Sequence, residues 1–123
     1  MAIKAYIKKS APPGDLPEAY IQWSGPASYT QVTLGPPVGG GDQIPNGLLG
    51  VSGIISIDFQ SGWGQADFTV TPIRVSEKLW VLKWMALRTG TIGGQSQTIG
   101  TEAAATTNLS AEYIQIQAIT RGA

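Results

Sequence analysis

Apolar and polar residues alternate along most of this 123-residue chain, and a period of two is the pattern of half-buried β-strands. The alternation predicts strands at residues 2–9, 18–24, 28–35, 48–60, 65–75 and 111–120, and a largely apolar run predicts a further strand at 79–88. Glycine- and proline-rich stretches lie between several of them, at residues 10–17, 36–47 and 89–108. The last of these stretches is an extended loop or a weak edge hairpin. The pattern therefore predicts an all-β chain with long Gly/Pro-rich loops.

The segment GIISIDFQSGWGQADFTVTP, residues 53–72, predicts a β-hairpin with a tryptophan at its tip. Gly62 can adopt the positive φ that a two-residue type II′ turn requires at its first loop position, and Trp63 is then the second loop residue. A four-residue loop over 61–64 leaves the same strand pairing intact. Turn chemistry and apolar pattern agree on one register for this hairpin.

In that register Asp58 lies opposite Asp67 on the polar face of the hairpin. The other face is apolar and holds Ile55, Ile57, Phe59, Ala66, Phe68 and Val70. Facing carboxylates repel, so something should offset them. The alternatives are a solvated pair or a pair that binds a lysine or arginine of another subunit, a calcium ion, and a glycosidase-like acid pair. We prefer the first, because few other acids and no histidine accompany the pair.

The stretch LWVLKWMALR, residues 79–88, is apolar on both faces when it is read as a strand. Such a strand is central in its sheet and covered on both sides. Trp80 and Trp84 share one face and are predicted to be core residues, whereas Trp23 fits either the core or the surface. A short helix over 79–88 is the alternative interpretation of this run.

Short strands, glycine-rich turns and the lack of a convincing helical pattern predict a β-sandwich or small barrel, with a jelly-roll-like arrangement as the first expectation. The length fits a single domain over residues 1–123. Residues 1–17 are predicted to form a strand followed by a proline-rich arm, which can add a strand to a neighbouring subunit. The last strand, 111–120, should turn Ile114 and Ile116 inward.

Charge and composition narrow the chemistry open to this chain. Eight basic and eight acidic residues cancel, and charged residues make up only 13% of the chain, about half the usual share. This balance gives no electrostatic reason to expect a nucleic acid or a membrane as partner. Cysteine and histidine are missing, which excludes disulfides, thiolate chemistry and imidazole catalysis. We therefore expect no enzyme and no cofactor, and a surface reserved for protein neighbours.

Trp63 on a hairpin tip is the leading candidate for a contact residue. Exposed aromatic rings anchor in pockets of other proteins or stack on sugar rings. We favour the protein anchor because the chain is poor in charge, and sugar stacking by Trp63, with Trp23 as a second platform, is the alternative. The candidate interface residues lie on the turn, the first strand and the long loops: Gly62, Trp63, Ile3, Tyr6, Ile7, Pro36, Pro37, Ile92 and Ile99.

Three segments carry a resemblance to a known class of protein. They are the proline-bearing arm MAIKAYIKKSAPPGDLP and the low-charge loops GPPVGGGDQIPNG and GTIGGQSQTIGTEAAATTN. With the absence of cysteine and histidine, they make the chain resemble small all-β virion proteins of tailed bacteriophages, of the decoration (cement) or tail and connector type. The resemblance implies a non-enzymatic protein that forms dimers or trimers and contacts other virion proteins. A carbohydrate-binding module is the alternative.

The N-terminal sequence MAIKAYIKKS has no apolar core of signal-peptide length. The longest apolar run, residues 79–87, is too short to span a bilayer and contains Lys83. We therefore expect a protein that is made in the host cytoplasm, is not secreted through a signal peptide and ends in the virion.

Overall fold

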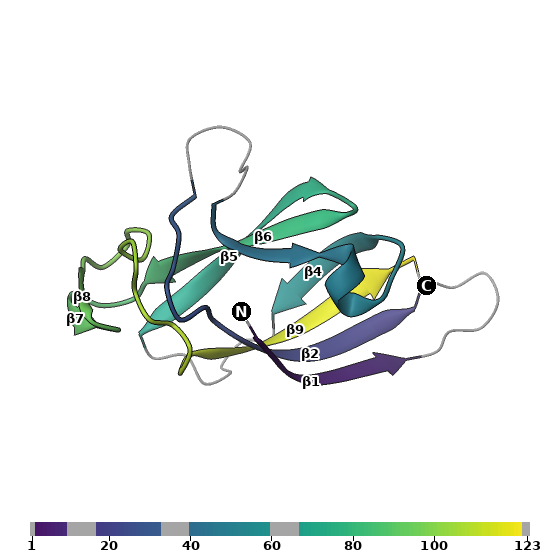
Figure 1. Ribbon diagram of the computed structural model, residues 1–123, viewed down its shortest axis with the longest axis horizontal. Helices are drawn as coiled ribbons and strands as arrows, with labels where there is room; N and C mark the ends of the chain where they lie inside the picture. The colour runs from purple at the N-terminus through teal and green to yellow at the C-terminus, as the bar shows by residue number, and fades with distance from the viewer. Residues whose placement is uncertain (1, 10–16, 33–39, 60–66, 122–123) are drawn as a thin grey trace.

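The computed structural model describes the backbone of residues 2–9 together with residues 17–32, 40–59 and 67–121, and it confirms the all-β fold (Figure 1). The strands are β1 (Ala2–Lys9), β2 (Glu18–Ser24), β3 (Asp42–Pro45), β4 (Ile54–Phe59), β5 (Phe68–Ser76), β6 (Leu79–Ala86), β7 (Gly90–Ile92), β8 (Gln95–Gln97) and β9 (Tyr113–Thr120). The helical element of the described residues is one short 3-10 helix, η1 (Asn46–Leu49).

Two antiparallel sheets pack against each other as a sandwich. The four-stranded sheet has the order β1-β2-β9-β4, and the three-stranded sheet has the order β3-β6-β5. The small β7–β8 hairpin lies at one end of the sandwich (Figure 1). From β2 to β5, successive strands alternate between the two sheets. The predicted β-sandwich is therefore confirmed, whereas the jelly-roll-like arrangement stays a prediction.

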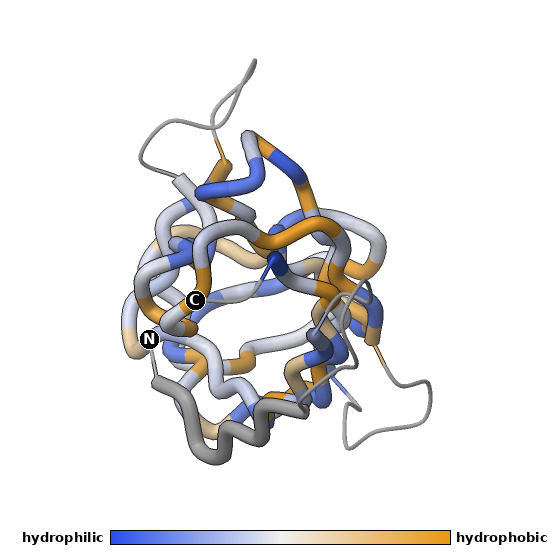
Figure 2. The backbone as a smooth tube through the Cα atoms, turned by 90° about the vertical axis from the view of Figure 1, so that its right-hand side faces the viewer, coloured by the Kyte–Doolittle hydropathy of each residue, from blue (hydrophilic) through white to orange (hydrophobic). Residues whose placement is uncertain are grey.

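Apolar side chains from both sheets meet in one core. Its largest fully buried members are Trp23, Trp84, Tyr29, Phe68, Ile21, Ile44, Ile54, Leu82, Leu109 and Ile116. Figure 2 shows hydrophobic and hydrophilic stretches interspersed along the chain. The rings of Phe68 and Trp84 meet edge to face, with centroids 6.4 Å apart, and Trp80 Nε1 donates a hydrogen bond of 2.9 Å across the sheets to Ile54 O. All three described tryptophans are therefore core residues, including Trp23.

β6 lies in the middle of the three-stranded sheet, as the sequence predicted, and the helix alternative for 79–88 is wrong. Its inward side chains Trp80, Leu82, Trp84 and Ala86 are buried. Val81 on the opposite face is buried too, and Gly41 lies against it. A Cβ atom added to Gly41 would lie only 2.2 Å from Val81 Cγ1, and Gly41 has a φ of +76°. Glycine thus allows the backbone to lie directly on the outer face of β6.

The predicted hairpin over 53–72 is wrong. β4 pairs with β9 in the four-stranded sheet, whereas β5 pairs with β6 in the three-stranded sheet. Both strands still turn an apolar face toward the same core. Alternation alone therefore cannot distinguish a hairpin from a crossover between sheets, because each buries the same face. The loop residues Gly62 and Trp63 lie outside the described residues.

β4 also differs from its prediction in length and in the residues that face the core. The strand predicted over 48–60 begins only at Ile54, after η1. Its pairing with β9 shifts register between Ile54 and Ser56. Ile54 and Ile57 are buried and Ile55 is half-buried, so the prediction that Ile55 faces the core is wrong. A register shift of this kind breaks the strict period of two.

Two segments before β4 were also assigned incorrectly. The described part of the strand predicted over 28–35 is irregular, and it is held by hydrogen bonds of Tyr29 N to Thr107 O (2.9 Å) and of Thr106 N to Tyr29 O (2.8 Å). The loop predicted over 36–47 contains β3, which pairs with the first half of β6. β3 carries few apolar residues, so its pairing with β6 accounts for the strand better than its own β-propensity does.

β1 pairs with β2 of its own chain along its length. The register places Ile3 opposite Trp23, Tyr6 opposite Ile21, and Ile7 opposite Tyr20. An irregularity between Ile3 and Ala5 interrupts the predicted alternation. Farther along the chain, the edge hairpin foreseen within 89–108 is present as β7 and β8.

Candidate functional site

An exposed pair of apolar side chains lies just beyond the end of β6, near the β7–β8 hairpin. Ala86 N donates to Thr101 O (2.8 Å), and Gly100 N donates to Ala86 O (2.9 Å). These two bonds form a β-bulge at Ala86, and Leu87 and Ile99 are the next residues along the two bonded segments. Leu87 is 41% exposed and Ile99 is 62% exposed. We call Leu87 and Ile99 the apolar pair.

Ile99 is presented by a tight turn. Thr101 N donates to Thr98 O (3.1 Å), and the Thr101 hydroxyl donates to the same oxygen (2.6 Å). Gly100 has a φ of +81°, which suits the third residue of a type II turn. Ile99 N donates to Thr89 Oγ1 (3.1 Å) and so fixes the turn against the segment between β6 and β7. The arrangement predicted for Trp63, an apolar side chain on a turn tip, is thus found at Ile99.

A charged pair borders the apolar pair. Arg88 Nε donates to Asp67 Oδ1 at 2.6 Å, and both side chains are partly exposed. Leu87 N donates to Asp67 O (2.8 Å), which brings this charged pair beside Leu87. Burial, with a further contribution from the negative charge of Asp67, raises the pKa of Glu112 above its usual value. The Arg88–Asp67 ion pair thus gives the apolar pair a polar rim on the side of Leu87.

The predicted facing of Asp58 and Asp67 is wrong. Asp58 is exposed and lies opposite Gln117 of β9, because β4 pairs with β9. Asp67 precedes β5 and binds Arg88. The two carboxylates therefore share no register position, and the reasoning for a calcium ion or an acid pair between them no longer holds. The described residues contain no group of three or more His, Cys, Asp or Glu side chains arranged to hold a metal ion.

The other interface candidates are spread over the chain. Ile92 is half-buried in β7 and packs against the core. Ile3, Tyr6 and Ile7 belong to β1. Gly62, Trp63, Pro36 and Pro37 lie outside the described residues. Leu87 is the contact candidate that sequence reasoning missed, because it belongs to the run 79–88, which was predicted to be covered on both faces. Its signal was an apolar residue at an outward position beyond the buried run.

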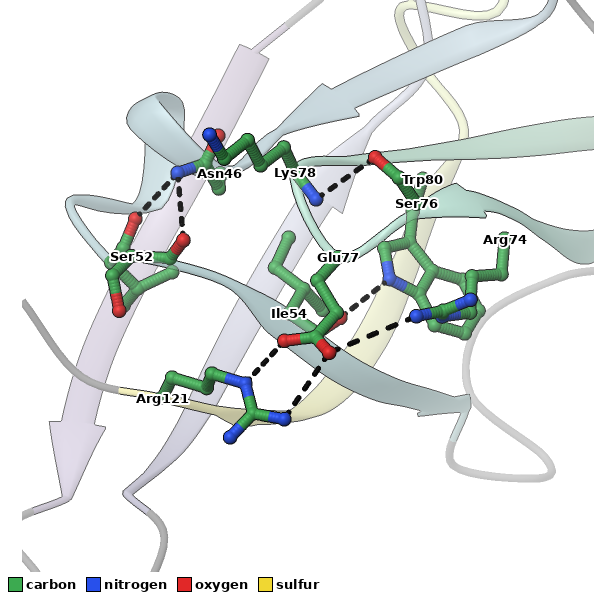
Figure 3. A network of polar contacts seen from close by, with 10 residues as sticks. Asn46, Ser52, Ile54, Arg74, Ser76, Glu77, Lys78, Trp80 and Arg121 are labelled. Atoms are coloured by element: carbon green, nitrogen blue, oxygen red, sulfur yellow. Dashed lines mark hydrogen bonds and ion pairs between the residues drawn. The ribbon is translucent and has the colours of Figure 1, made fainter.

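A network of polar contacts lies at the opposite end of the sandwich (Figure 3). Glu77, in the turn between β5 and β6, accepts hydrogen bonds from Arg121 and forms a longer ion pair of 3.8 Å with Arg74. The hydrogen bond from Arg121 is the main cause that lowers the pKa of Glu77. Asn46 Nδ2 donates to Val51 O (2.9 Å) and thereby holds the segment after η1. These exposed contacts tie β9 to the β5–β6 turn, a structural role.

The buried Asp42 and the half-buried Glu102 have structural partners as well. Asp42 Oδ2 accepts from Trp23 Nε1 (2.8 Å) and from Trp84 Nε1 (3.1 Å). Glu102 Oε2 accepts from the Tyr29 hydroxyl (2.7 Å). Burial, and then the hydrogen bond to Glu102, raises the pKa of Tyr29 well above its usual value. Nothing in the sequence indicated these contacts, because their partners are far apart in the chain.

No protein-family model, curated protein or solved structure matches this chain. No helix in the described part of the chain is long and apolar enough to cross a membrane.

Proposed function

We propose that this chain is a non-enzymatic structural protein that acts through protein–protein contacts, as a virion component of the decoration or tail and connector type. The observation that supports the proposal is the apolar pair. Single exposed apolar residues are ordinary, but Leu87 and Ile99 follow directly on two hydrogen-bonded segments and are both well exposed. Burying them against a partner would recover the free energy that their hydration costs.

The geometry of the apolar pair suits a contact with protein. Ile99 is fixed by turn hydrogen bonds, so little conformational entropy is lost when a partner covers it. The Arg88–Asp67 pair beside it provides the polar rim that surrounds the apolar centre of protein interfaces. The low charge of the whole chain fits the same purpose.

The alternative, a carbohydrate-binding module, loses one of its two stacking platforms. Trp23 is fully buried and donates its indole N–H to Asp42, so its ring is not available to a sugar. Stacking would then depend on Trp63.

The test is the native mass of the full chain across a concentration series. We expect wild type to form a closed oligomer and Leu87→Ser/Ile99→Ser to be shifted toward monomer. The control is Leu48→Ser/Val75→Ser, which removes two other exposed apolar side chains, one from η1 and one from β5. Assembly that survives the first double variant contradicts the role of the apolar pair. A wild type that stays monomeric and is retained on a polysaccharide column contradicts the structural function.

A further inference from the structure

One buried carboxylate joins three strands of the two sheets. Asp42 begins β3 and is only 2% exposed. Its Oδ2 atom accepts two indole N–H groups, from Trp23 of β2 at 2.8 Å and from Trp84 of β6 at 3.1 Å. β2 belongs to the four-stranded sheet, whereas β3 and β6 belong to the three-stranded sheet. We call Asp42, Trp23 and Trp84 the indole latch.

The second oxygen of this carboxylate is unusual. Asp42 Oδ1 is buried and has no hydrogen-bond partner in the part of the chain that the structure describes. If Asp42 were ionised, its negative charge would be buried, and hydrogen-bond donors would stabilise only one of its two oxygen atoms. Burial of such a charge is unfavourable. A neutral carboxyl group fits better. Its proton can sit on Oδ1, and Oδ2 then remains a carbonyl oxygen that accepts both indole bonds.

The groups around the latch do not provide a strong counter-charge. Tyr29, whose hydroxyl group accepts a hydrogen bond from Trp84 N, is neutral. The carboxyl group of Glu102, to which the same hydroxyl group donates, is acidic. Burial raises the pKa of Asp42 to about 6, against the opposing effect of the two indole N–H groups and a smaller one from the N-terminal positive charge. On β6, the cationic Lys83 belongs to the outward set of side chains, so it faces away from the core.

We propose that the indole latch is a proton-operated switch between the two sheets: the buried negative charge destabilises the sandwich when Asp42 is ionised, and protonation of Asp42 removes that cost. The folded state binds the proton more tightly than the unfolded chain, whose Asp has a pKa near 3.8. The stabilisation is therefore complete at pH values below that of the unfolded carboxyl, and it is lost as the pH rises through about 6. The free energy of unfolding should therefore rise on mild acidification. This inference goes beyond the proposed function and does not depend on assembly.

The composition of the chain makes the switch measurable. Because the chain has no histidine, the only side chains that can titrate between pH 5.5 and pH 7.5 are acids with raised pKa values. Among the described acids these are Asp42 and, by direction, Glu112. With Asp42 values of 3.8 unfolded and about 6 folded, linkage lowers the unfolding equilibrium constant about 4-fold from pH 7.5 to pH 5.5.

The experiment is urea unfolding of the full chain at both pH values, for wild type, Asp42→Asn and Glu112→Gln. We expect the unfolding constant of wild type and of Glu112→Gln to fall on acidification, and that of Asp42→Asn to change less than 2-fold. In wild type, near-UV circular dichroism of the tryptophans should titrate with a midpoint near pH 6. A flat wild type, or a pH dependence that survives in Asp42→Asn, would overturn the proposal.

A second measurement keeps the proposal testable if Asp42→Asn does not fold. The side-chain carboxyl 13C shift of Asp42 in wild type should titrate near pH 6. Trp84→Phe removes one N–H group that favours the ionised form, so it should move the midpoint to higher pH. A midpoint in wild type below pH 5, or a downward shift in Trp84→Phe, refutes the switch.

Discussion

Tyr29→Phe is the sharpest test of how the irregular segment before β3 is held. The Tyr29 side chain is 1% exposed, and its hydroxyl group serves two partners. It donates to Glu102 Oε2 at 2.7 Å and accepts from Trp84 N at 3.2 Å. Val32 N also donates to Glu102 Oε2 at 2.7 Å, so the carboxylate keeps one donor in the variant. The substitution removes one oxygen atom and leaves the ring in place.

The expected cost follows from these two bonds. A hydrogen bond to a charged group contributes about 1.5–3 kcal/mol, and a buried N–H group that loses its acceptor costs about 1–3 kcal/mol. Because the two effects share one atom and are not additive, we expect a total of about 3 kcal/mol. For a chain of 123 residues the entropy of unfolding is about 0.26 kcal/mol/K, so the melting temperature should fall by about 12 °C.

Thermal and urea unfolding of the full chain measure this cost, and the chain supplies a matched control. Tyr20 makes the same kind of bond, from its hydroxyl to Glu18 Oε2 at 2.6 Å, but on the outer face of the sandwich. Water replaces that partner, so Tyr20→Phe should move the melting temperature by less than about 2 °C. Equal effects of the two substitutions would refute the reasoning that burial decides the cost of the lost hydroxyl.

Three further predictions concern packing and contact. Gly41→Ala should destabilise the protein more than Gly50→Ala in urea unfolding. Both glycines have a positive φ, but of the two only Gly41 faces a close neighbour, Val81, so equal losses of unfolding free energy would exclude a steric cause. Deletion of residues 2–9 should lower the midpoint of urea unfolding, since β2 loses its partner strand, and an unchanged midpoint would show that β1 is dispensable. Trp63→Ala should leave stability within about 1 kcal/mol and weaken assembly on native mass measurement, whereas a large loss of stability would make Trp63 a core residue.

The sequence predicted the strands best where one face is buried along the whole element. In β9, Ile114 and Ile116 are buried and Gln115 is half-exposed, as a period of two requires. β6 was found from a different signal, a run that is apolar on both faces. The partner of each strand could not be predicted, because β4 and β5 bury the same faces in a hairpin or in separate sheets. Pairing of distant strands depends on the whole core, which a local pattern does not contain.

The candidate site was predictable only in part, for a related reason. Ile99 was proposed as a contact residue from its place in a long loop, and it is exposed. Asp42 gave no signal, because an aspartate among glycines and prolines is typical of a turn. Its burial follows from two tryptophans that lie 19 and 42 residues away. Long-range hydrogen bonds of this kind have no local pattern.

The turn that presents Ile99 is supported from inside the protein. Gln97, the last residue of β8, is buried, and its amide donates to Thr107 Oγ1 (2.8 Å) while its oxygen accepts from Ala104 N (3.0 Å). The Gln97 side chain thus joins the two ends of the segment 97–107, which contains the turn. A buried amide that satisfies both partners fixes a backbone without the help of a sheet. The exposure of Ile99 is therefore a property of an ordered segment, and an ordered apolar side chain loses less entropy on contact than a mobile one.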